Sequence, residues 1–245
     1  MFQKARKQSA YLKIALSGAS GAGKTFSALR LARGLVPNGK IAVIDTENGS
    51  SNLYASQFDF DVTEIEPPYT INKLIEATKY ALNNDYDVII QDSGSHWWEG
   101  VLSYKKSLDD RGGNSFANWQ TANEHYKLYL RATLASNVHT IVTLRSKTEY
   151  LLQENEKGKF TPKKVGLAPI HRDGVEYEFS CVLDISASSS HEAQATKDRT
   201  NLFGDSIFMI TEETGARIMQ WLNDSDDLQG AEPSSTVIGM AHNGR

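Results

Sequence analysis

Along most of the chain, short β-rich apolar runs alternate with stretches in which apolar residues recur with the period of an α-helix, about 3.6 residues. The first part of the chain predicts strands at 11–17, 40–45, 86–92 and 139–144. The helix period predicts helices at 24–35, 71–82 and about 119–135. Strands and helices that alternate in this way favour an α/β fold, with a mostly parallel central sheet flanked by helices.

The pattern changes after Arg145. Two short runs at 148–154 and 159–165 flank a turn at 155–158, and they predict a β-hairpin excursion in the C-terminal part of the fold. Later runs predict a strand pair, a strand and a helix, at 176–187, 191–199, 206–211 and 212–222. We therefore predict one domain over residues 1–222. Residues 223–245 lack periodicity and are expected to form a flexible C-terminal tail.

Composition and charge narrow the classes of function. The formal net charge of -4 argues against a uniformly basic nucleic-acid binder, although it leaves room for a local basic patch. Cys181 is the only cysteine, so an intrachain disulfide is excluded, and Cys/His metal-ligand spacings are absent from the sequence. No run approaches the length of a membrane span, so we expect a cytoplasmic protein without membrane contact.

A phosphate-binding pattern lies between the first predicted strand and the first predicted helix. Residues 18–25 read G-A-S-G-A-G-K-T, which matches G-x-x-x-x-G-K-[ST]. Small residues let backbone N–H groups face phosphates, Lys24 is expected to reach the β- and γ-phosphates, and Thr25 is expected to bind Mg²⁺. An ordinary glycine turn is disfavoured by the strand before and the helix after. The predicted ATP-binding residues are Gly18, Ala19, Ser20, Gly21, Ala22, Gly23, Lys24, Thr25 and Phe26.

Two acidic residues follow predicted strands. Asp92 ends the run 86–92, where a P-loop fold needs a carboxylate for the Mg²⁺ water shell. Ser93 follows it, so a neighbouring glutamate that would activate water is missing. Glu47 comes after the second strand, on the same expected edge of the sheet. Its position fits a residue that orients the attacking water and fits a surface carboxylate equally well.

A P-loop followed by a strand that ends in I-D-T-E resembles the RecA-like recombinases, in which that glutamate activates the hydrolytic water. Four segments, YDVIIQDSGSHWWEG, HTIVTLRSKTEY, HRDGVEYEF and ATKDRTNLF, resemble phage-encoded P-loop ATPases of the Sak type, which are single-strand annealing or recombination proteins. The resemblance covers about residues 10–210. It implies a RecA-like P-loop NTPase fold, Glu47 as catalytic base, a homo-oligomeric filament or ring, and the cytoplasm of a bacterial host.

Besides Lys24, four cations are candidates for contact with the γ-phosphate. Lys197 and Arg199 have the K-x-R spacing that places both on one face of a strand, which by itself favours a solvated pair. The family resemblance instead implies a finger that reaches a neighbouring subunit's γ-phosphate. Arg145 follows the fourth strand with Lys147, and both are expected to sense the γ-phosphate or to contact DNA.

The stretch 145–172 is locally basic, with seven basic residues against three acidic ones and with Tyr150 and Phe160 interleaved. Such a loop suits single-stranded DNA, because cations pair with its backbone and aromatic rings stack on its bases. A solvated hairpin is the alternative. The predicted DNA-binding residues are Lys147, Lys157, Lys159, Lys163, Lys164 and Arg172. His96, Trp97, Trp98 and Trp119 are expected to be structural.

Together these features predict an ATP-hydrolysing protein that acts on single-stranded DNA in recombination, annealing or replication, with DNA expected to stimulate turnover. A single-strand DNA-binding protein is a further candidate partner. One rival is an annealing or loading module that uses bound ATP as an assembly switch and turns it over incidentally. The other is an assembly or packaging accessory without DNA contact.

Overall fold

The computed structural model describes residue 2 and the ranges 10–154 and 160–224, and one sheet runs through these residues. The strands are β1 (Lys13–Gly18), β2 (Ile41–Asp45), β3 (Asp61–Glu64), β4 (Val88–Asp92), β5 (His139–Glu154), β6 (Phe160–Pro169), β7 (Cys181–Ile185), β8 (Glu192–Asp198) and β9 (Ile207–Met209). The α-helices are α1 (Lys24–Leu35), α2 (Ile71–Asn83), α3 (Gly94–Asp110), α4 (Ser115–Leu134) and α5 (Glu212–Asn223), and two 3₁₀ helices are η2 (Ser50–Tyr54) and η3 (Val175–Glu178).

The strand order is β3-β2-β4-β5-β1-β7-β8-β9, with β6 paired to β5 outside this path. Neighbours from β3 to β7 are parallel, whereas β8 and β9 are added in antiparallel fashion. β1, which leads into the P-loop, is separated from β4 by β5. The predicted α/β fold with a mostly parallel sheet is confirmed, and it is the fold of P-loop NTPases.

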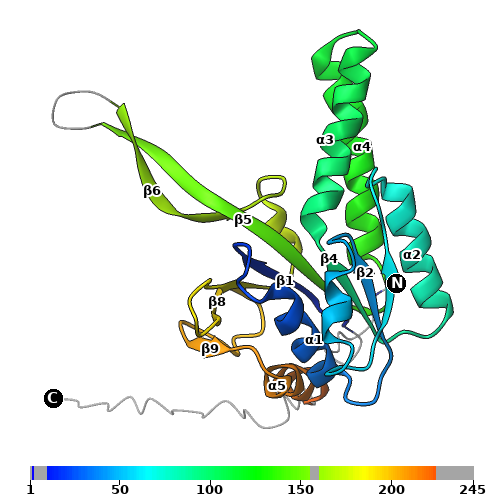
Figure 1. Ribbon diagram of the computed structural model, residues 1–245, viewed down its shortest axis with the longest axis vertical. Helices are drawn as coiled ribbons and strands as arrows, with labels where there is room; N and C mark the ends of the chain where they lie inside the picture. The colour runs from blue at the N-terminus through cyan, green and yellow to red at the C-terminus, as the bar shows by residue number, and fades with distance from the viewer. Residues whose placement is uncertain (1, 3–9, 155–159, 225–245) are drawn as a thin grey trace, which may run out of the picture.

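Helices cover both faces of the sheet (Figure 1). One hydrophobic cluster joins α1 and α5 to the sheet, and a second joins α2, α3 and α4 to it. Helices α1 and α5 pack closely where Gly34 of α1 lies near Gly215 of α5. A Cβ on Gly34 would lie 1.9 Å from the Glu212 carbonyl oxygen. Parallel strands buried on both sides explain the nearly continuous apolar runs of β1 and β4.

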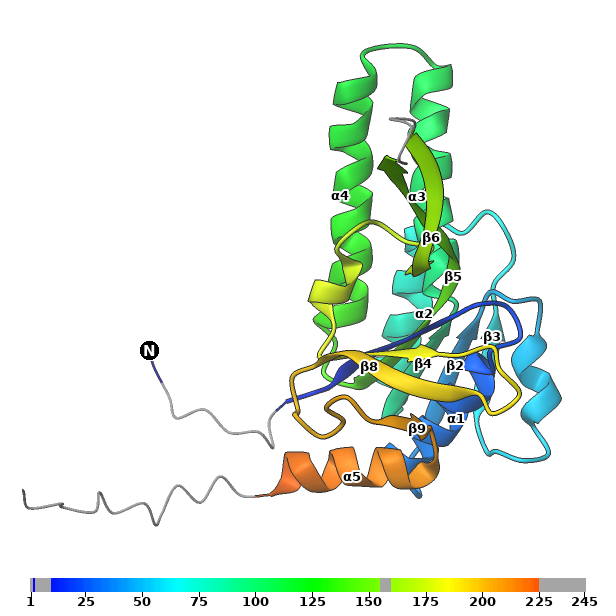
Figure 2. The same cartoon turned by 90° about the vertical axis from the view of Figure 1, so that its left-hand side faces the viewer.

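A two-stranded ribbon and a helical hairpin project from the edge of the sheet at which the parallel strands end. β5 continues beyond the sheet and pairs with β6 as a long two-stranded ribbon, which we call the arm, residues 146–154 and 160–169. α3 and α4 form a helical hairpin that projects in a different direction from the same edge (Figures 1 and 2). The nucleotide loop lies at this edge too, since β1 ends there.

The structure corrects several predicted boundaries. β5 does not stop at Leu144 but runs without interruption into the arm, because strand pairing passes from β1 to β6 at Arg145 and Ser146. The expected strand 176–187 is shorter, and its first residues form η3. The edge strand β3 had no predicted counterpart. The expected turn at 155–158 and nearly all of the expected tail lie outside the described residues.

The helix α3 is the largest element that the periodicity missed. Its first residues include Gly94, two tryptophans and Gly100, and this composition has poor intrinsic helix propensity. Packing stabilises the helix instead: Trp97 is fully buried, and a Cβ on Gly100 would lie 1.8 Å from the Tyr69 carbonyl oxygen. Within the described ranges, no helix is long and apolar enough to span a bilayer.

Candidate nucleotide-binding site

The P-loop connects β1 to α1 and is shaped by glycines. Gly23 caps α1 in the left-handed region, at φ 83°, where a side chain would be strained. Gly18 has no room for a side chain, because a Cβ there would lie 2.8 Å from the Ile185 carbonyl oxygen. The amides that begin α1 have no acceptor within the helix and are free to face an anion, and the helix dipole adds to this preference.

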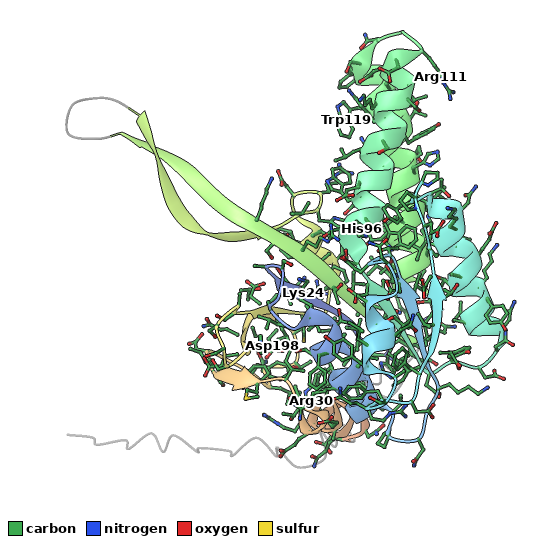
Figure 3. All side chains as sticks on the ribbon, viewed as in Figure 1. Lys24, Arg30, His96, Arg111, Trp119 and Asp198 are labelled. Carbon is green, nitrogen blue, oxygen red and sulfur yellow. The ribbon has the colours of Figure 1, made fainter. Side chains whose placement is uncertain are left out.

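Lys24 lies over this loop (Figure 3). Its Nζ donates hydrogen bonds to the carbonyl oxygens of Gly18 and Ala19, each at 2.9 Å. Burial lowers the pKa of Lys24, while the negative charges of Asp92 and Glu47 act in the opposite direction. A cation held over a ring of backbone amides fits the β- and γ-phosphates of a nucleotide.

Thr25 and Asp92 meet beside the P-loop. The Thr25 hydroxyl donates to Asp92 Oδ2 at 2.6 Å, and Thr143 donates to Asp92 Oδ1. Burial raises the pKa of Asp92, and the two hydroxyl hydrogen bonds oppose that rise. The described residues contain no group of three or more His, Cys, Asp or Glu side chains that would hold a metal. One hydroxyl and one carboxylate fit Mg²⁺ that arrives with phosphate and water ligands.

The loop after β2 is fixed by its own polar residues. Asp45 accepts hydrogen bonds from the backbone N–H groups of Glu47 (2.6 Å) and Ser51 (2.9 Å). Thr46 joins this loop to the end of β4, because its N–H donates to the Asp92 carbonyl and its hydroxyl accepts from the Ser93 N–H at 2.8 Å. In I-D-T-E, therefore, Asp45 and Thr46 set the loop that presents Glu47 to the cleft.

Glu47 is paired with Arg145 across the cleft. Arg145 Nε donates to Glu47 Oε1 at 2.7 Å, and Nη2 contacts Oε2, so the pair is bidentate. Burial acts to raise the pKa of Glu47, but the hydrogen bonds and charge of Arg145 outweigh it and hold this pKa below its ordinary value. Two residues proposed separately from sequence thus form one unit, although 98 positions separate them.

The cleft has a volume of about 590 Å³ and is lined by three groups of residues. The P-loop supplies its floor, and the acids and Arg145 supply one wall. The rest of the lining was not predicted and consists of Ser50, Leu53, Tyr54, Ser146 and Ile170. Thr143 was missed as well, although a hydroxyl within the apolar run 139–144 is a usable signal. The residues of η2 carry no comparable signal.

Two predicted neighbours of the nucleotide are used structurally. Ala22 is fully buried, and the ring of Phe26 packs against Tyr54 and Phe58 at centroid distances of 5.4 and 5.3 Å. His96 is a structural residue, as expected: it is buried, hydrogen-bonded to the Thr46 hydroxyl at 2.7 Å and stacked on Tyr69. Trp97 lies in the core, whereas Trp98 and Trp119 are half-buried and stack on each other in the helical hairpin.

Lys197 and Arg199 lie away from their own P-loop. Lys197 pairs in register with Val182, near the amino end of β7, whereas the P-loop contacts the carboxyl end of that strand. Both cations donate to the carbonyl oxygen of Tyr177, at 2.6 Å from Lys197 and 3.4 Å from Arg199. They lie close together, although Arg199 follows the last residue of β8 and so does not share a strand face with Lys197, and neither contacts the cleft described above.

The predicted DNA-binding residues fall into three groups. Lys147 is exposed at the base of the arm, and Lys163 and Lys164 belong to β6. Arg172 instead stacks on the Tyr126 ring of α4, at 4.8 Å from its centroid. Lys157 and Lys159 lie outside the described residues.

Comparison with known proteins adds one finding. A family model described as an AAA domain matches residues 10–220, a range that includes the P-loop, Glu47, Asp92 and the arm. A search of the curated proteins finds no match to the chain.

Proposed function

The chain belongs to the AAA domain family of P-loop ATPases, and we propose that it is a RecA-like ATPase that hydrolyses ATP in response to single-stranded DNA. The observation that carries this proposal is the course of β5. The strand contacts Asp92 through Thr143, lines the nucleotide cleft at Arg145 and continues into an arm that lies within the locally basic stretch 145–172. One continuous strand is suited to link DNA contact to ATP turnover.

Four side chains account for hydrolysis. Lys24 binds and orients the β- and γ-phosphates, and Thr25 and Asp92 would hold Mg²⁺. When bound, Mg²⁺ neutralises charge on the phosphates. Glu47 accepts a proton from water as the water oxygen bonds to the γ-phosphorus and the bond to the β-γ bridging oxygen breaks, so that ADP leaves with the electron pair.

The unpredicted wall of the cleft fits the rest of the nucleotide. Leu53 is 78% exposed and Tyr54 is half-buried, and both belong to η2 and line the cleft. An apolar side chain and an aromatic ring there suit the flat face of a base. We assign the nucleobase of ATP to Leu53 and Tyr54, while the P-loop holds the phosphates.

Single-stranded DNA is the substrate class that best fits the arm. The arm extends from the sheet as a ribbon, and its two strands pair from Ser146 with Pro169 to Glu154 with Phe160 (Figure 1). Its sequence combines lysines with aromatic residues, which suits backbone contact and base stacking. We also propose assembly into a homo-oligomer, in which Lys197 and Arg199 complete a neighbour's site. Their separation from their own P-loop is compatible with action in trans.

The test measures steady-state ATP hydrolysis with and without an oligo-dT strand. We expect stimulation in the wild type, and we expect Glu47→Gln to retain nucleotide binding but to lose turnover by about 10²-fold or more. The arm variant Lys163→Ala/Lys164→Ala should lose stimulation and keep the DNA-free rate. Its DNA affinity should depend less steeply on salt, with a slope smaller by about 1.4 for two lost contacts.

Each part of the proposal has an opposing outcome. Equal turnover in the wild type and Glu47→Gln would remove Glu47 from the role of base. The absence of salt-dependent binding to oligo-dT, together with the absence of stimulation, would favour the accessory without DNA contact. Stable assembly on DNA with negligible turnover would favour the ATP-switched annealing module.

A further inference from the structure

Arg145 lies where the nucleotide cleft meets the arm. In the parallel part of the sheet Arg145 pairs with Gly18, and at the next residue, Ser146, the antiparallel pairing with β6 begins. Its carbonyl oxygen accepts a hydrogen bond from the Ile170 N–H at 2.6 Å, just after the other strand of the arm. A displacement at the base of the arm therefore acts directly on Arg145.

β5 contacts each chemical part of the cleft through a different side chain. Thr143 donates to Asp92, the candidate Mg²⁺ ligand, and Arg145 binds Glu47. The Ser146 hydroxyl lies 2.8 Å from the hydroxyl of Ser17, which immediately precedes the P-loop. Within four residues, the strand that forms the arm thus contacts the candidate Mg²⁺ ligand Asp92, the candidate catalytic base Glu47 and the serine that precedes the P-loop.

The contact with Arg145 makes Glu47 a poor base. Both carboxylate oxygens contact the guanidinium, and the pKa of Glu47 is held below its ordinary value. A general base needs an accessible oxygen and a pKa closer to the working pH. A carboxylate held in this way is not free to accept a proton from water, and its release would restore that capacity.

We propose that Arg145 is a positioning residue that restrains Glu47 until single-stranded DNA displaces the base of the arm. The proposal rests on the proposed function, in which the arm binds DNA. When Arg145 leaves Glu47, the γ-phosphate offers a second anionic partner of matching geometry, because guanidinium binds phosphate in bidentate fashion as it binds carboxylate. Exchange between these partners frees Glu47 at the moment when the phosphate is held.

The chain provides a matched control in a second arginine–glutamate pair. Arg30 of α1 binds Glu212 of α5 through the same two nitrogens, Nε donating to both carboxylate oxygens at 3.2 and 3.1 Å and Nη2 to one of them at 2.9 Å. Arg30 lies further along α1 than Lys24, toward α5, and it is absent from the lining of the cleft (Figure 3). Its loss removes a similar ion pair without touching Glu47.

The experiment compares the wild type with Arg145→Ala, Arg145→Lys and Arg30→Ala, each with and without oligo-dT. We expect Arg145→Ala to raise the DNA-free rate by about 5-fold or more and to bring the ratio of stimulated to DNA-free rates close to 1. Arg145→Lys keeps a charge but loses the fork, so its ratio should be intermediate. Arg30→Ala should keep the wild-type rate and ratio.

The pH profile gives a readout that a merely structural role would not move. In the free enzyme Arg145 lowers the pKa of Glu47, and without it burial, which raises this pKa, is opposed only by the charge of His96 and a hydrogen bond from Ser93. The acid limb of the DNA-free kcat/KM profile should therefore move to higher pH in Arg145→Ala. It should stay in place in Arg30→Ala.

The possible failures are distinguishable. An Arg145→Ala protein that binds nucleotide but has a DNA-free rate at or below that of the wild type, with an unmoved acid limb, overturns the restraint by Arg145. Should Arg145→Ala fail to fold, Arg145→Lys decides by the same two measurements. A wild type that oligo-dT does not stimulate overturns the proposed function instead, while the DNA-free rate and the acid limb still judge Arg145.

Discussion

A lysine whose pKa is lowered by burial lies at each end of the parallel strands, at the amino edge and at the carboxyl edge of the sheet. The two lysines differ in their hydrogen-bond partners. At the amino edge, Lys13 Nζ donates to the carbonyls of Val138 (2.6 Å) and Ser136 (2.9 Å) and to two hydroxyls, of Ser136 and Thr140. At the carboxyl edge, Lys24 contacts only carbonyls of its own loop among the hydrogen bonds described and faces an open cleft.

This difference separates a structural charge from a functional one. Burial lowers the pKa of Lys13 to about 8, so a shifted pKa alone would favour the wrong lysine. Lys13 joins the start of β1 to the connection between α4 and β5, and its four acceptors are all within the protein. Lys24 instead lies among Thr25, Asp92 and Glu47, whose chemistry is completed by a ligand. A lysine that faces a cleft lined by ligand-binding groups, rather than burial itself, identifies the site.

The largest effect should come from removing the lysine of the carboxyl edge. Lys24→Ala takes away the cation that meets phosphate charge, so we expect ATP hydrolysis to fall by about 10³-fold, or about 4 kcal/mol of transition-state stabilisation. The free energy of unfolding without nucleotide should change by less than about 1 kcal/mol, because Lys24 is half-exposed to the cleft. Kinetics and urea unfolding on the same protein check both parts. A large loss of stability would mean that Lys24 is structural, like Lys13.

His171 is a buried titratable group with weaker polar contacts than Lys13. Its ring lies among Trp98, Tyr126 and Tyr129 at centroid distances of 5.3 to 5.9 Å, and a backbone contact to Arg172 opposes the effect of burial on its pKa. Burial lowers the pKa of His171 to about 4. Unlike Lys13, this residue is neutral in the folded protein at neutral pH.

That contrast predicts acid sensitivity. Between pH 6.5 and 4 the unfolded chain binds a proton at His171 that the folded chain does not, so stability falls as pH falls, by up to about 3 kcal/mol. In His171→Phe this share of the pH dependence should disappear. Urea unfolding at pH 7 and pH 4.5 gives the comparison, and identical pH dependence in the two proteins would show that the pKa of His171 is the same in the folded and unfolded chains.

Local patterns in the sequence predicted the parts of the molecule that depend on local physics. The apolar runs of β1, β2 and β4 are buried on both faces, and the P-loop is a contiguous motif, so both could be recognised without tertiary information. α3 could not, because Trp97 and Gly100 are accommodated by packing against distant residues. The pairing of Glu47 with Arg145 depends on the carboxyl ends of β2 and β5 lying on either side of β4, which no spacing encodes.

The amino edge is tested by Lys13→Met. The substitution keeps an apolar stem but leaves the carbonyl oxygens of Ser136 and Val138 without the ammonium donor, so we expect a loss of about 2 kcal/mol in the free energy of unfolding. The melting temperature should fall by about 4–8 °C. ATP hydrolysis at a temperature where the variant is folded should match the wild type. A reduced rate there would mean that the two edges are coupled through β1.

The smallest effect should come from Thr143→Val, and a second threonine on β5 sharpens it. Thr143 touches no substrate but donates to Asp92, whose pKa burial already raises. Without this hydrogen bond Asp92 is less firmly held and less ready to stay ionised, so the Mg²⁺ concentration for half-maximal hydrolysis should rise by about 10-fold. Thr140 lies three residues earlier on β5 and contacts Lys13 at the opposite edge. Thr140→Val should lower stability and leave the Mg²⁺ dependence unchanged. If both variants shift it equally, the hydroxyl acts through the general stability of β5, and the two edges are less independent than their lysines indicate.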